Sequence, residues 1–186
     1  MWLLNYLPFK IIFQEKIAVR DDENVGELYS ELMVLGATVL RKTVDAIEKN
    51  NYPQIPQDHI TDIKHAPKIF KETCKIDWSK DVDYTYNFIR GLSPYPAAFT
   101  MLDGKVFKIY RADKITAGSR GGDPAETDAT GATVQNRGTG IGKIETDNKT
   151  FLRFFCTNGL IDVKECQLEG KKKMNIEEFL RGAKLS

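Results

Sequence analysis

The stretch from Phe88 to Arg111, FIRGLSPYPAAFTMLDGKVFKIYR, marks a change from helical to β structure. A helical pattern ends at residues 89–92, and the corner Ser93-Pro94-Tyr95-Pro96 follows. Each proline fixes φ and pushes the residue before it into an extended conformation, so the helix cannot continue. Asp103-Gly104 then separates two apolar runs, which predicts a β-hairpin.

Five segments after the corner have the composition of short strands: 97–102, 105–112, 141–146, 149–156 and 160–168. Tight-turn pairs such as Asp147-Asn148 and Asn158-Gly159 separate them, which predicts an antiparallel meander or a small barrel. Gly118 to Gly140 has almost no large apolar residues and is expected to be a long mobile loop. Asn175 and Glu178 form a capping box for a final helix with Ile176, Phe179 and Leu180 facing inward.

The sequence before the corner predicts one strand, two helices and a linker. Ile11 to Val19 is rich in β-formers. Asn24 can cap a helix that ends near residues 50–51 and has an apolar stripe at Leu28, Leu32, Leu35 and Val39. One strand and one helix do not make a core, so their partner lies later in the chain or outside it. Tyr52 to Lys64 reads as an extended linker, and Ser79 can cap the second helix.

The composition is that of a globular protein, and the net charge does not indicate a class of ligand. The chain has 186 residues, of which 41% are hydrophobic and 28% charged, with a formal net charge of +1. A nucleic-acid role must therefore rest on local basic clusters. Three cysteines without a C-x-x-C pair are expected to be packing residues in a reducing cytoplasm. The apolar N-terminus is too short and interrupted to span a membrane, and it lacks the features of a signal peptide.

No catalytic or metal site is predicted. His59 and His65 have no metal-ligand spacing with another histidine, cysteine or carboxylate. G-x-S-x-G is absent, and residues 138–142 fail the dinucleotide pattern because Lys143 occupies the place of its third glycine. Paired carboxylates such as Asp81 and Asp83 stand at helix starts, where they stabilise the helix.

Basic residues are the more informative group. Lys68 and Lys71 stand close together just after the linker, Arg90 lies at the end of the second helix, and Lys171-Lys172-Lys173 follows the last strand. Basic side chains bind phosphates, and nearby aromatics (Tyr95, Phe107 and Tyr110) can stack on bases. The alternative is that the lysines are ordinary solvated residues and that the aromatics fill the barrel.

The ordered segments HAPKIFKE, KIDWS, FIRGLSPYPAA, KIYRA and QLEGKKKM, between residues 65 and 174, resemble the C-terminal part of the methionyl-tRNA formyltransferase family. The family pattern has A-x-K, I-D-W, I-R-x-x-x-P-x-P, a K-I/V strand and Q-x-x-G-K-K/R-x-M before a final helix. Residues 11–47 also resemble the last strand and helix of the family's catalytic domain. The family's N-P-W-P is here Ser93-Pro94-Tyr95-Pro96.

The resemblance implies an α+β chain: a strand–helix remnant of a Rossmann-like formyltransferase domain (residues 1–50), a linker (51–66), and an OB-like antiparallel β-barrel with flanking helices that binds tRNA (67–186). The family transfers formyl from 10-formyltetrahydrofolate to methionyl initiator tRNA. Its catalytic N-x-H, S-L-L-P and D-T-G segments are absent from the sequence. The fragment alone is therefore expected to be inactive, without a bound cofactor.

Under this resemblance, Lys68 and Lys71 match linker lysines that face the acceptor arm, and Arg90 and Lys171 to Lys173 match basic positions of the C-terminal domain. Arginine at position 90 can also simply stabilise the helix end and the corner. Tyr95 and Phe107 are expected to wedge the helix against the barrel. The chain is expected to be a cytoplasmic monomer without membrane or metal partners. The alternative is the structural C-terminal domain of a nucleotide-sugar or folate formyltransferase.

Overall fold

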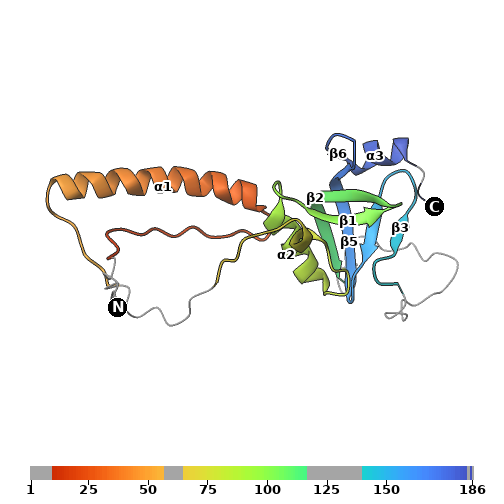
Figure 1. The fold of residues 1–186 in the computed structure, drawn as a ribbon, viewed down its shortest axis with the longest axis horizontal. Coiled ribbons are helices and arrows are strands. Elements are labelled where there is room, and N and C mark those ends of the chain that lie inside the picture. The colour runs from red at the N-terminus through yellow and green to blue at the C-terminus, as the bar shows by residue number, and fades with distance from the viewer. Residues whose placement is uncertain (1–9, 57–64, 117–139, 184, 186) are drawn as a thin grey trace, which may run out of the picture. The chain divides into compact units, whose positions relative to one another are not determined.

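The computed structural model describes residues 10–56, 65–116, 140–183 and 185, and these form two compact units (Figure 1). The first unit comprises the chain up to Glu23 together with Glu27–Lys68, and the second comprises Asn24–Gly26 and the chain from Ile69 onward. Most of the expected loop and half of the expected linker lie outside the described residues. None of the helices within the described ranges is both long and apolar enough to cross a membrane.

The first unit is built on α1 (Val25–Glu48), which matches the expected helix. The Asn24 side chain accepts a hydrogen bond from Gly26 N at 2.9 Å, as an N-cap does. An extended segment runs beside the helix, and Lys42 Nζ lies 4.5 Å from the centre of the Phe13 ring. The expected strand over 11–19 was wrong: only an isolated bridge between Ile11 and Ile55 forms. A strand needs a neighbour at successive residues, and none of the described segments provides one here.

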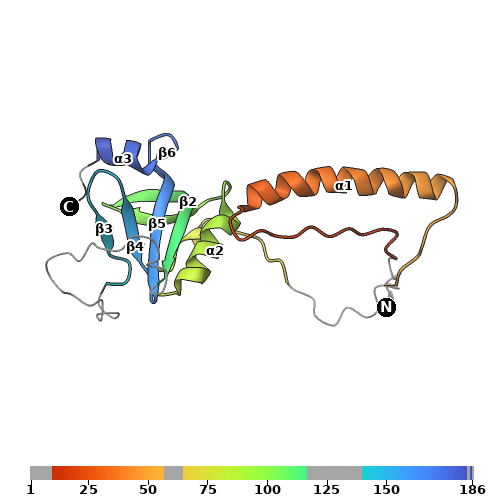
Figure 2. The ribbon, with the colours of Figure 1, turned by 180° about the vertical axis from the view of Figure 1, so that it is seen from behind.

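The second unit contains the expected antiparallel sheet, which curls on itself (Figures 1 and 2). Its strands are β1 (Ala98–Leu102), β2 (Lys105–Thr116), β3 (Ile144–Thr146), β4 (Leu152–Phe155), β5 (Gly159–Leu168) and β6 (Met174–Asn175). The spatial order is β1-β2-β5-β4-β3, with β6 also on β5. All five expected strands are present; β6, at two residues, is too short to show alternation.

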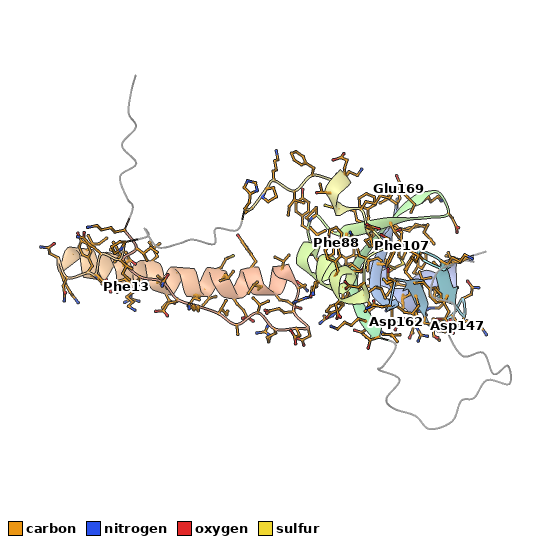
Figure 3. The ribbon with its side chains drawn as sticks, turned by 90° about the horizontal axis from the view of Figure 1, so that it is seen from below. Phe13, Phe88, Phe107, Asp147, Asp162 and Glu169 are labelled. Carbon is orange, nitrogen blue, oxygen red and sulfur yellow. The ribbon has the colours of Figure 1, made fainter. Side chains whose placement is uncertain are left out.

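The core of this unit lies on the inner face of the sheet. Phe107 is fully buried, and its ring centre lies 5.2 Å from that of Phe179 in α3 (Ile176–Gly182) and 6.3 Å from that of Phe154 (Figure 3). The Asn175 side chain caps α3 by accepting from Glu178 N at 2.8 Å. The predicted inward residues of this helix are buried, as are all three cysteines: Ile176, Phe179, Leu180, Cys74, Cys156 and Cys166.

Helix α2 (Val82–Leu92) begins two residues later than a Ser79 cap would place it. Asp81 is the N-cap and accepts from Tyr84 N at 2.7 Å, whereas the Ser79 hydroxyl donates to Asp77. The prediction of Ser79 was wrong because two candidate caps stand close together and only packing selects one. The α2 helix packs on β2 and β5.

The Pro-Tyr-Pro corner terminates α2 as predicted. Both X-Pro bonds, Ser93-Pro94 and Tyr95-Pro96, are cis. The chain turns back so that Ala97 N donates to Leu92 O at 2.9 Å, which leads directly into β1. Tyr95 is 86% exposed, so the expectation that it wedges the helix against the sheet was wrong. The turn points its ring into solvent, and the buried Phe107 fills the core instead.

Candidate nucleic-acid interface

The two linker lysines fall on either side of the boundary between the units. Lys68 is the last residue of the first unit, whereas Lys71 belongs to the second. Lys71 is exposed and sits immediately before the short 3₁₀ helix η1 (Glu72–Cys74), whose Cys74 N donates to Lys71 O at 3.1 Å. Both lysines are exposed, which phosphate binding requires.

Two apolar residues between these lysines also face solvent. Ile69 is 56% exposed and Phe70 is 54% exposed. An exposed aromatic ring that follows or precedes lysines closely in the sequence suits stacking on a nucleobase. The segment KIFK contains this signal, because Phe70 stands between the two predicted lysines.

Arg90 makes the contacts of a helix-terminal arginine. It lies in the last turn of α2, where a cation stabilises the partial negative charge of the helix end. Its Nε donates to Asn87 Oδ1 at 2.7 Å, and its guanidinium carbon lies 5.9 Å from the centre of the Tyr86 ring. These local contacts support the structural reading of Arg90 that the sequence left open.

Lys171 to Lys173 follow a tight turn after β5. Lys171 N donates to Leu168 O at 2.9 Å across this turn, and Gly170 has φ +77°, which a residue with a side chain adopts only with strain. Lys172 lies 3.5 Å from Glu178, and Lys173 lies 2.6 Å from Glu165. Two of the three lysines are therefore already paired with carboxylates of the same unit.

Two further lysines, which the sequence did not single out, lie on or beside the sheet that carries this turn: Lys108 in β2, and Lys75 in a bridge to the edge strand β1. Lys75 bridges to Phe99 of β1, and Phe99 is the register partner of Lys108 in β2. In CKI and FKI each lysine stands between apolar residues, so strict alternation could have identified both as outward-facing.

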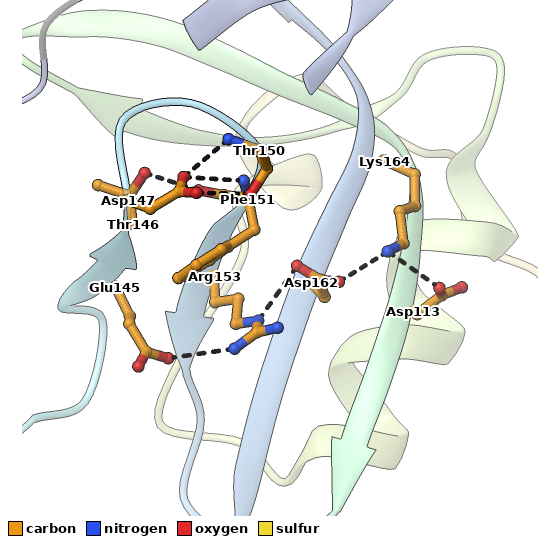
Figure 4. Close-up of polar contacts among 9 residues, drawn as sticks. All are labelled: Asp113, Glu145, Thr146, Asp147, Thr150, Phe151, Arg153, Asp162 and Lys164. Atoms are coloured by element: carbon orange, nitrogen blue, oxygen red, sulfur yellow. Dashed lines mark hydrogen bonds and ion pairs between the residues drawn. The ribbon is translucent and has the colours of Figure 1, made fainter. Parts of the chain in front are cut away.

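A row of charged side chains crosses β3, β4, β5 and β2 (Figure 4). Arg153 lies 3.7 Å from Glu145 and 3.4 Å from Asp162, which is almost buried. Lys164 joins Asp162, at 2.7 Å, to Asp113, at 3.4 Å. Hydrogen bonding to Asp162 raises the pKa of Lys164. Three carboxylates against two cations make this part of the face unfavourable for phosphate.

The described residues show no arrangement for nucleophilic or metal-assisted chemistry. Burial raises the pKa of the Cys166 thiol to about 12 and raises the pKa of Cys156, so neither is a ready thiolate. Within the described residues no three histidine, cysteine or carboxylate side chains gather as metal ligands.

In a comparison with known proteins, residues 68–184 match the family described as formyl transferase, C-terminal domain. Methionyl-tRNA formyltransferase of Phocaeicola vulgatus is 41% identical over 95% of the chain and 52% of its own length. The enzyme of that name from Parabacteroides distasonis is 38% identical over 94% of the chain and 51% of its length. The chain thus spans about half the length of the curated relatives that it matches.

Crystal structures of HypX from Aquifex aeolicus have a similar fold. One variant aligns with a TM-score of 0.60 at 15% identity, over 98% of the chain and 31% of HypX. The complex with tetrahydrofolic acid aligns with a TM-score of 0.56 at 16% identity, over 91% of the chain and 28% of HypX. At such identities the likeness concerns the fold alone.

Proposed function

The chain belongs to the family of formyl transferase C-terminal domains, and on that premise we propose that it is the tRNA-binding half of a methionyl-tRNA formyltransferase. The observation that carries this proposal is the 41% identity to an enzyme of that name over 95% of the chain. The whole enzyme would transfer formyl from 10-formyltetrahydrofolate to methionyl initiator tRNA in the cytoplasm. This half would supply RNA contacts, and the other half of the enzyme would supply the chemistry.

The surface of α1 supports the proposal that residues 1–50 complete a larger domain. The helix has no buried residue. Its large exposed apolar residues, most of them at helical spacing, are Val25, Tyr29, Leu32, Met33, Val34, Leu40, Val44 and Ile47. A helix that is apolar over so wide an arc is usually packed inside a larger core. The catalytic half of the enzyme would cover this surface.

The exposed side chains around the linker support contact with RNA. Lys68 and Lys71 would bind phosphates of the acceptor arm, and Phe70 between them would stack on an unpaired base. Lys171 to Lys173 would contribute on the sheet side. Arg90 would act chiefly through α2, because it already bonds Asn87.

Initiator-tRNA binding measured against salt concentration tests the proposal. Each phosphate contact contributes about 0.7 to 0.9 to the slope of log affinity against log salt. We expect Lys68→Ala with Lys71→Ala to lower that slope by about 1 to 2, whereas Lys149→Ala, which removes an exposed lysine from the β3–β4 turn, should leave it unchanged. Absence of binding at low salt, or binding that ignores salt, contradicts the proposal.

A formyl-transfer assay with methionyl-tRNA tests the division of labour. The chain alone should give no turnover, because it lacks N-x-H, S-L-L-P and D-T-G. Turnover by the chain alone would mean that the chemistry uses other residues. If Lys68 and Lys71 prove indifferent and tRNA does not bind, the structural domain of a small-molecule formyltransferase becomes the better explanation.

A further inference from the structure

Four residues form a row across the outer face of the sheet: Lys75, Phe99, Lys108 and Gln167. Lys75 bridges to Phe99, Phe99 pairs with Lys108, and Lys108 pairs with Gln167 of β5. Residues directly opposite each other on paired strands place their side chains on the same face. The flanking residues Cys74, Ile76, Ala98, Thr100, Phe107 and Ile109 are buried, so the row faces outward.

The lysines of this row and of the neighbouring loop fall into two groups by their partners. Within the described part of the chain, Lys75, Lys108 and Lys171 form no ion pair with a carboxylate, whereas Lys172 pairs with Glu178 and Lys173 pairs with Glu165. Lys173 Nζ also lies 5.0 Å from the centre of the Tyr110 ring. Phosphates compete poorly for cations that already have carboxylate partners, so the first three lysines are the better phosphate ligands.

Gln167 ties the loop to the row. Tyr110 OH donates to Gln167 Oε1 at 2.7 Å, and Gln167 Nε2 donates to Lys171 O at 2.8 Å. Glu169 N donates to Val106 O at 2.8 Å and holds the start of the turn on β2. Lys171 is therefore carried on a backbone that is fixed beside Lys108 before any ligand binds.

A bulge in β2 and β5 separates this end of the outer face from a part with a different charge. The register shifts on either side of Arg111, and the next outward residues belong to the row of Asp113, Asp162 and Glu145 with their two cations (Figure 4). The carboxylates make phosphate unfavourable there. Among the described residues of this face, the end that carries Lys75, Lys108 and Lys171 combines aromatic rings with cations that have no carboxylate partner.

We propose that this end of the outer sheet face binds the RNA backbone, with Lys75, Lys108 and Lys171 as its phosphate ligands and with Tyr110 and Gln167 as positioning residues. The inference rests on the proposed tRNA-binding function and assigns a surface within it. Adjacent strands are about 4.8 Å apart, so Lys75 and Lys108, separated by β1, have backbones about 10 Å apart. Flexible lysine side chains at that spacing can reach successive phosphates of one strand.

The test compares salt slopes of initiator-tRNA binding. The triple variant Lys75→Ala, Lys108→Ala, Lys171→Ala should lower the slope by about 2 to 3 and the affinity at low salt by roughly tenfold or more. Lys105→Ala is the matched control, because Lys105 lies on the same strand as Lys108 at an odd spacing and so on the opposite side of the pleat. It should bind like the wild type.

Positioning and charge can be separated by the same measurement. Gln167→Ala should weaken binding severalfold without changing the salt slope, because the phosphate contacts remain but the loop must be ordered on binding. Tyr110→Phe, which keeps the ring beside Lys173, should have a smaller effect in the same direction. Circular dichroism of each variant checks that the sheet is retained. If the triple alanine variant loses the sheet, glutamine replaces alanine at the three lysine positions.

The outcomes distinguish the two proposals. Salt-dependent binding by the wild type with an unchanged slope in the triple variant overturns this surface and leaves the tRNA-binding function standing. Absence of binding by the wild type overturns the function and removes the ligand of this surface with it. A slope change in Lys172→Ala and Lys173→Ala as large as that in Lys171→Ala would contradict the distinction between paired and unpaired lysines.

Discussion

The indole of Trp78 lies almost parallel to the ring of Phe154, with ring centres 4.5 Å apart and planes 5° apart. Its Nε1 donates to Thr100 Oγ1 at 3.0 Å. Trp78 precedes α2, Thr100 belongs to β1 and Phe154 belongs to β4, and all three are buried. One side chain thus joins the segment before the helix to strands near both ends of the sheet order.

Removing either side of the Trp78–Thr100 bond should destabilise the fold by different mechanisms. We expect Trp78→Ala to cost about 3–5 kcal/mol through lost contacts and a cavity. Thr100→Val should cost about 1–3 kcal/mol because it leaves the buried Nε1–H of Trp78 without an acceptor. The double variant Trp78→Phe, Thr100→Val should cost less than the sum of its single changes. Urea unfolding measures the free energy of unfolding of these three variants and of the single variant Trp78→Phe. Strict additivity in the double variant would refute the coupling.

The cap of α2 can be tested against its sequence-based rival. Asp81→Ala should cost about 1 kcal/mol of unfolding free energy, because Tyr84 N loses its acceptor. Ser79→Ala should change stability by less than about 0.5 kcal/mol, because its hydroxyl bonds only the exposed Asp77. The same unfolding measurement decides, and a larger effect at Ser79 would restore the rejected cap.

Asp147 should make stability fall in acid. Its carboxylate accepts from the Thr150 hydroxyl and from the N–H groups of Lys149, Thr150 and Phe151, which holds its pKa well below the usual value. A lowered folded-state pKa gives stability that is complete above the unfolded value of about 3.9 and lost as pH falls toward the folded value.

The melting-temperature difference between wild type and Asp147→Asn should therefore be constant near neutrality and shrink below about pH 4. Thr150→Val, which removes the largest of these interactions, should raise the pKa of Asp147 and move the loss to higher pH. Carboxyl NMR titration measures this directly. An ordinary titration of Asp147 in the wild type would show that the turn does not hold the charge.

Gly159 is expected to tolerate no side chain. A Cβ there would lie 2.4 Å from Ile115 O and 3.1 Å from Val82 Cβ. Gly159→Ala should therefore destabilise the unit by about 1–3 kcal/mol through forced backbone movement. Gly182→Ala is the matched control, because nothing lies within 4 Å of the new Cβ; it should be neutral or stabilising by up to about 1 kcal/mol. Equal effects at both positions would contradict the packing described at Gly159.

Local signals in the sequence predicted most of the second unit. Asp103-Gly104 predicted the β1–β2 turn, which both residues form with positive φ, and Asn175 predicted the start of α3. Phe107, which was expected either to stack on bases or to wedge the helix against the barrel, is fully buried in the core, and the outward-facing Lys108 was not predicted. The strand expected over 11–19 failed because its composition was right but no partner strand lies beside it in the described residues. The six predicted RNA contacts stay predictions.

The sequence by itself determined where helix gives way to sheet, because proline geometry and turn chemistry act within a few residues. It also determined the family, through ordered motifs from HAPKIFKE to QLEGKKKM. Only the tertiary structure decided that Lys75, Phe99, Lys108 and Gln167 share a row, and that Lys172 and Lys173 are paired while Lys171 is held by Gln167. Strand register and side-chain pairing join residues distant in the chain, so no local pattern could have specified them.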